Sequence, residues 1–183
     1  NCLNETGATL SNGNLDAVLT AAGSGNESVR GTLAAKSGKF YREELLVDTG
    51  NQSGFYGVVD ASVGSNIRLD GTATINVVLY AASNGNKVVN GTSTSYGASF
   101  TTGDIIGVAL DLDGGTITFY KNGTSQGSIS LPATGIAYTP AWAWGGAASA
   151  GTTNTNFGQR PFAYTPPTGY KSLCTANLPD PTI

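Results

Sequence analysis

Apolar residues alternate with polar or small residues along much of the segment 103–127. Side chains two positions apart on a β-strand lie on the same face, whereas apolar residues on a helix recur every three or four positions. The segment has the first spacing and lacks the second, so it predicts a meander of three strands. The apolar residues that we expect this meander to bury are Ile106, Val108, Leu110, Ile117 and Phe119.

Two tight turns separate the strands of this meander. Asp113-Gly114-Gly115 follows the first strand and Asn122-Gly123 follows the second. Glycine and asparagine tolerate the positive φ angles that tight hairpin turns require. The turns therefore specify the register of all three strands locally.

Similar strand patterns recur along the rest of the chain, and Asn-Gly or Gly-Ser turns separate them. The expected strands cover residues 15–21, 28–33, 40–47, 55–59, 72–82, 96–100 and 138–144, with a short one near Phe157. Many short strands at such spacing are typical of a sandwich. The fold class we predict is all-β, a two-sheet antiparallel β-sandwich of the jelly-roll kind, forming a single domain over residues 1–183. We expect this domain to be a module of a longer protein.

Composition and charge exclude several functions. The net charge is −3 and only nine residues are Lys or Arg, whereas nucleic-acid binding needs a clustered basic face. No apolar run approaches 18 residues, so we expect no membrane insertion.

The chain contains no histidine, which removes the commonest general base, the usual serine and cysteine triads and most zinc sites. A facing carboxylate pair would remain, but Glu43 and Glu44 are adjacent and so point to opposite faces of a strand. Asp111 and Asp113 flank a turn too tight for a calcium loop. We expect no enzymatic activity, no cofactor and no metal.

Four motifs in order give the chain a resemblance to the SPRY domain, a β-sandwich used as a recognition module. The motifs are Ser37-Gly38-Lys39-Phe40-Tyr41-Arg42-Glu43, Tyr138-Thr139-Pro140-Ala141-Trp142, Asn156-Phe157-Gly158-Gln159-Arg160-Pro161-Phe162 and the meander. With Thr9-Leu10-Ser11-Asn12-Gly13-Asn14-Leu15 and Leu173-Cys174-Thr175-Ala176-Asn177-Leu178-Pro179 near its ends, the chain is most similar to copies in bacteriophage tail and other virion structural proteins.

This resemblance implies a non-catalytic recognition module in an extracellular virion particle. Its partners would be a host surface glycan or protein, or another virion protein, and oligomers could arise through the parent assembly. One alternative is a purely architectural domain that decorates a capsid or tail. Another is a carbohydrate-binding accessory module of a secreted enzyme.

Arg42 and Glu44 depart from the family pattern, which has an aromatic and an aliphatic residue there. Their side chains share a face of the strand. Burying both without partners would be prohibitive, so we expect that face to be exposed or covered by another chain.

The candidate binding residues are Asn84, Asn86, Tyr96 and Trp144, with the loop 145–155 that follows the last of them. These segments interrupt strong strand patterns with polar, Gly-rich sequence, where a rigid sandwich varies its surface. Tyr96 and Trp144 would offer stacking area and the two Asn side chains hydrogen bonds. Trp144 could instead belong to the core, as we expect for Trp142.

Cys2 and Cys174 are the only cysteines, one near each end. Sandwich domains often bring their termini together, and the related copies tend to carry both residues, which favours a terminal disulfide. The alternative is two small buried thiols in a reducing cytosol.

Overall fold

A computed structural model describes residues 2–6, 8–19, 26–48, 54–63, 76–145 and 151–178, without the side chains of 2–6, 19, 26, 27, 144 and 145. The strands are β1 (Cys2–Thr6), β2 (Ala8–Ser11), β3 (Asp16–Leu19), β4 (Asn26–Gly31), β5 (Lys39–Asp48), β6 (Gly54–Asp60), β7 (Val77–Ala81), β8 (Lys87–Val89), β9 (Thr92–Thr94), β10 (Ile105–Asp111), β11 (Thr116–Lys121), β12 (Thr124–Ser130), β13 (Tyr138–Gly145), β14 (Gly151–Asn156) and β15 (Lys171–Ser172). The helix η1 (Thr175–Asn177) is a single 3₁₀ turn. Within these ranges, no helix is long and apolar enough to cross a membrane.

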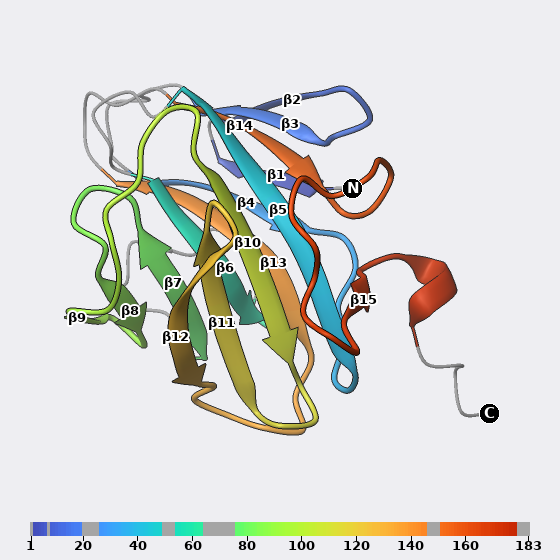
Figure 1. Cartoon of the computed structure of the whole chain (residues 1–183). Coiled ribbons are helices and arrows are strands. Elements are labelled where there is room, and N and C mark those ends of the chain that lie inside the picture. The colour runs from blue at the N-terminus through green and yellow to red at the C-terminus, as the bar shows by residue number, and fades with distance from the viewer. Residues whose placement is uncertain are drawn as a thin grey trace.

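The strands form two sheets that pack face to face (Figure 1). Over the described residues, one sheet has seven strands in the order β1-β4-β13-β6-β7-β8-β9. The other has the order β12-β11-β10-β5-β14-β3-β2, and β15 pairs with β5 in parallel. All other pairings are antiparallel, so the predicted all-β sandwich is confirmed.

The predicted meander is confirmed in register and burial. In the β10–β11 pair, Val108 lies opposite Phe119 and Leu110 opposite Ile117. The five residues expected in the core are at most 3% exposed. The turns have the expected backbone, because Gly115, Asn122 and Gly123 adopt φ angles of 65°, 47° and 78°.

Two expected strands differ from the structure. The strand expected over 72–82 is β7, which begins at Val77; residues 72–75 lie outside the described ranges, and Asn76 has a φ of 57°, which no strand accommodates. Residues 96–100 form no strand. Their sequence alternates, but their backbone bonds go to a loop, from the Gly97 N–H to Gly85 O and from the Phe100 N–H to Ala82 O.

The expected loop 145–155 is shorter than its composition suggests. Residues from Gly151 onward form β14, which lies between β5 and β3 inside its sheet. The strand expected near Phe157 is this one, and it ends at Asn156. Small polar residues such as Thr153 and Thr155 are buried here because this interior strand turns them toward the opposite sheet, and no local pattern shows this.

The prediction for Arg42 and Glu44 is wrong, because both side chains are buried between the sheets at 3% and 0% exposure. They are partners of one another, since Arg42 Nε lies 2.7 Å from Glu44 Oε1. Arg42 Nη2 also donates to Gly57 O at 2.6 Å, and Thr155 Oγ1 donates to Glu44 Oε2 at 2.7 Å. The guanidinium packs over the Trp142 ring at 5.6 Å. Every charge in the pair is therefore offset within the core.

Candidate functional site

The candidate site is one end of the sandwich, the loop rim, formed by residues 82–86, 95–104 and 122–123 and the backbone of 144–145. Hydrogen bonds and strand pairing place these segments together. Trp144 pairs with Gly54 across β13 and β6, and the Ala82 N–H donates to Gly54 O at 2.9 Å. The Asn122 N–H donates to Ile105 O at 2.9 Å, which brings the β11–β12 turn to the same end.

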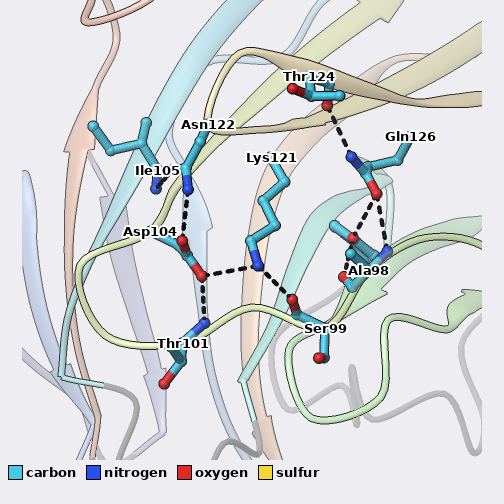
Figure 2. Close-up of polar contacts among 10 residues, drawn as sticks. Ala98, Ser99, Thr101, Asp104, Ile105, Lys121, Asn122, Thr124 and Gln126 are labelled. Carbon is cyan, nitrogen blue, oxygen red and sulfur yellow. Dashed lines mark hydrogen bonds and ion pairs between the residues drawn. The ribbon is translucent and has the colours of Figure 1, made fainter.

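A loop of ten residues, 95–104, forms the largest described part of the loop rim and carries no strand. Asp104 fixes its end, because the carboxylate accepts the Thr101 N–H at 2.8 Å and the Asn122 Nδ2 at 2.6 Å. Lys121 Nζ lies 3.3 Å from Asp104 Oδ2 and donates to Ser99 O at 2.7 Å. Figure 2 shows Lys121 reaching both partners from β11.

The electrostatics of this cluster favour a charged Asp104. Partial burial by itself would raise the pKa of the Asp104 carboxyl. The hydrogen bonds from Thr101, Asn122 and Lys121 outweigh that effect and lower the pKa below its usual value. We call the contacts among Asp104, Lys121, Asn122 and Ser99 the loop latch.

Gln126 attaches the middle of the same loop to β12. Its Oε1 accepts the Ala98 N–H at 2.9 Å, and its Nε2 donates to Thr124 O at 2.9 Å, as Figure 2 shows. The Tyr80 hydroxyl donates to Ala98 O from below. Backbone groups of the loop are thus satisfied by side chains, which orders it without a ladder.

Tyr96 bridges a break in the β11–β12 ladder. A bulge there sets Phe119 against two residues of β12, and Gly127 takes a φ of 107°. The Phe119 N–H donates to the Tyr96 hydroxyl at 3.3 Å, and that hydroxyl donates to Gly127 O. The ring is half-buried and packs edge-on against Tyr80 at 5.3 Å. The structure therefore gives Tyr96 a structural contact at the place where we predict ligand stacking.

Asn84 and Asn86 lie in the β7–β8 turn, where the sequence places them. Asn84 is exposed, and its Oδ1 accepts the Asn86 N–H at 3.0 Å. Asn86 Nδ2 donates to Ser93 Oγ at 3.0 Å. Gly85 between them has a φ of 71°, and a Cβ there would lie 2.2 Å from Gly97 O. Only glycine therefore allows this turn to touch the loop 95–104.

The backbone of Trp144 lies at the loop rim, but its side chain is outside the described part of the structure, so its role stays a prediction. Trp142 is 1% exposed, which confirms it as core. Sequence reasoning missed Asp104, Lys121 and Gln126. Lys121 and Gln126 bond to a loop more than 20 residues away, and Asp104 bonds to side chains of the β11–β12 turn, so a sequence carries no local signal of these contacts.

The described side chains of the site offer mainly hydrogen-bonding groups. Within the described ranges, no three His, Cys, Asp or Glu side chains gather to hold a metal. Asp104 and Lys121 offset one another. Exposed serine, asparagine and threonine positions dominate the surface, namely Ser83, Asn84, Ser99, Thr101, Thr102 and Asn122.

A family model described as the SPRY domain matches residues 41–159. The chain belongs to the SPRY domain family. This match spans β5 to β14, so it contains the loop rim and the latch of the domain described here.

Two curated relatives of this SPRY domain are vertebrate Ran-binding proteins. Ran-binding protein 9 of Xenopus tropicalis is 31% identical over 168 residues, which cover 85% of this chain and 29% of that protein. Ran-binding protein 9 of Homo sapiens is 32% identical over 147 residues, with 75% and 19% covered. The chain thus spans less than a third of these relatives, and they give no support to the resemblance to virion proteins.

Two solved structures share the fold. A human SPRY domain has a TM-score of 0.71 at 16% identity, covering 85% of this chain and 98% of that chain. The SPRY domain of human HERC1 has a TM-score of 0.66 at 23% identity, covering 84% and 94%. At these identities, the likeness shows the SPRY fold alone.

Proposed function

We propose that this SPRY domain is a non-catalytic protein-recognition module that binds its partner through the loop rim. The observation that carries the proposal is the loop 95–104. Its tip at 101–103 is exposed, yet its backbone is fixed by Asp104, Lys121 and Gln126. A surface that is ordered before binding loses less entropy when a partner docks.

A protein partner fits this surface better than a glycan that stacks on aromatic rings. Tyr96 uses its hydroxyl and much of its ring within the fold. The exposed side chains are amides and hydroxyls, which are adaptable hydrogen-bonding groups in protein interfaces. The names of the curated relatives state that they bind Ran. Because the chain covers less than a third of them, we extend only the recognition role to it.

Site-specific photo-crosslinking tests the proposal in the organism that expresses the protein. A photoreactive amino acid replaces Ser83 at the loop rim, or Thr134 at the opposite end as the matched control; both positions are exposed. We expect a crosslinked protein from position 83 and none from position 134. Crosslinks from position 134 alone, or from neither position, would contradict recognition through the loop rim.

We further propose, from the motif resemblance at both ends of the chain, that the parent protein is a virion structural protein. In that setting the partner is a host surface protein or glycan, or another virion subunit, and an architectural role is the alternative. Mass spectrometry of purified particles tests this localisation. Absence of the chain from every particle preparation would remove the virion setting and leave the recognition role to be judged by the crosslinking.

A further inference from the structure

A groove of about 460 Å³ lies on the outer face of the eight-stranded sheet. Its apolar floor is Leu45 and Val47 of β5 with Ile105 of β10. Ile105 lies opposite Leu45 in the β10–β5 pair, and Leu45 lies opposite Asn154 in the β5–β14 pair, so the three residues adjoin across the sheet. The remaining lining residues are Glu43, Asn156, Arg160, Pro161 and Ala163. We call it the outer-face groove.

Val47 lies at a β-bulge on the outer face of β5. Thr152 of β14 pairs with Asp48 of β5, and the next residue, Thr153, pairs with Leu46. Val47 is therefore the extra residue of the bulge. Bulges re-aim a side chain relative to the sheet. Val47 is 48% exposed and is the one large hydrophobic residue classed as exposed within the described ranges.

Arg160 supplies a positioned cation at the wall of the groove. Its Nη2 donates to Asn154 Oδ1, and Asn154 Nδ2 in turn donates to Asp16 Oδ1. The Asp16 carboxylate thus holds the Asn154 amide in the orientation that directs its oxygen toward Arg160. No carboxylate forms an ion pair with Arg160 among the described residues, and the guanidinium has five N–H donors, so it keeps donors for a ligand.

Glu43 also lines the groove, but its carboxylate is already engaged. Oε1 accepts the Tyr164 N–H at 2.9 Å and the Tyr41 hydroxyl at 3.3 Å. Oε2 accepts the Ala163 N–H at 2.8 Å. These donors hold the segment 161–164 against the sheet, so Glu43 forms part of the wall and Arg160 is the charge available to a partner.

We propose that the outer-face groove docks a partner-protein segment in which an aspartate or glutamate neighbours a branched aliphatic residue. The aliphatic side chain packs on Leu45, Val47 and Ile105, and the carboxylate accepts from Arg160. Charge complementarity selects this partner, because the guanidinium fork matches a carboxylate. The groove is a second surface, separate from the recognition role proposed for the loop rim.

The test is an NMR titration of the ¹⁵N-labelled chain with two peptides, Ac-Gly-Leu-Asp-Leu-Gly-NH₂ and the same peptide with Asn in place of Asp. We expect saturable shifts of the Leu45, Val47 and Ile105 amides. The Asp peptide should bind about fivefold more tightly, the upper end for an exposed ion pair. Arg160→Gln should abolish that preference, and Val47→Ser should weaken both peptides. Lys171→Gln, an exposed cation on β15, is the matched control and should change neither.

Three kinds of result, from peptide preference, from shift mapping and from sedimentation, would overturn the proposal. One is equal binding of the two peptides, or a preference that survives Arg160→Gln. Another is no saturable shift at millimolar peptide, or shifts confined to the loop rim. The third comes from sedimentation of the chain alone. A dimer that Val47→Ser dissociates would show that a second copy of the chain occupies the groove instead.

Discussion

Arg42 and Glu44 form a buried ion pair whose remaining hydrogen bonds come from two other strands. Burial raises the pKa of Glu44, while the Arg42 guanidinium and the Thr155 hydroxyl limit that rise. Such a pair is costly to assemble, yet breaking it leaves an uncompensated charge inside the protein. The pair therefore decides which substitutions the core tolerates at positions 42 and 44.

We expect Glu44→Leu to destabilise the fold by about 3–5 kcal/mol, because it leaves the Arg42 charge buried without its partner. The double variant Arg42→Met with Glu44→Leu should recover most of that loss, since apolar residues then replace both charges. Urea denaturation measures the three free energies of unfolding. A single variant within about 1 kcal/mol of the parent would contradict the buried pair.

Tyr96→Phe removes only the hydroxyl that bridges the β11–β12 bulge. The Phe119 N–H then loses its acceptor, so we expect a loss of about 1–3 kcal/mol with the aromatic packing retained. Tyr120→Phe on β11 is the control, because its side chain is half-buried and lies on the opposite face of the strand from Phe119. Equal losses in the two variants would show that the bridge contributes nothing specific.

At the scale of elements, local signals predicted the meander, because its two turns and its alternation of apolar and polar residues all lie within the 25 residues 103–127. Segment 96–100 shows the limit of that reasoning, since it alternates like a strand but its backbone bonds go to the 82–86 turn. β14 shows the converse, because its Thr and Asn residues are strand residues only through β5 and β3. The turn at Asn84–Asn86 and the run around Tyr96 lie together as predicted, since the Gly97 N–H bonds to Gly85 O, while their binding role stays a prediction and the latch depends on contacts between distant segments.

The loop latch should respond to acid. The folded pKa of Asp104 is lowered, so its contribution is fully present above the unfolded value of about 3.9 and is lost as the pH falls through the folded pKa. We expect hydrogen exchange of the 98–104 amides to accelerate in that acidic window relative to the core amides. Asp104→Asn should raise their exchange at neutral pH and remove the additional acid effect. An unchanged pH profile in that variant would contradict the role of Asp104.

At the scale of the whole molecule, described segments of the two sheets lie together at both edges of the sandwich. β1 lies at the edge of the seven-stranded sheet and β2 at the edge of the other, and the loop 95–104 spans the opposite side. The end away from the loop rim holds a cavity of about 500 Å³, which Gly31 and Cys174 both line. Cys2 pairs with Gly31 through the β1–β4 ladder. The backbone of Cys2 is therefore paired with one lining residue of a cavity that Cys174 also lines.

The Cys2–Cys174 disulfide stays a prediction, because Cys174 is a free thiol in this structure and the Cys2 side chain lies outside the described part. A bond between them would close a loop of about 170 residues and contribute on the order of 5 kcal/mol on the chain-entropy model. We expect non-reducing peptide mapping of air-oxidised protein to find the linked peptides, and reductant to lower the free energy of unfolding. Cys2→Ser cannot form the bond, so its free energy of unfolding should equal that of the chemically reduced parent, with or without reductant. Alkylation of both thiols in the native, unreduced protein would instead establish two free cysteines.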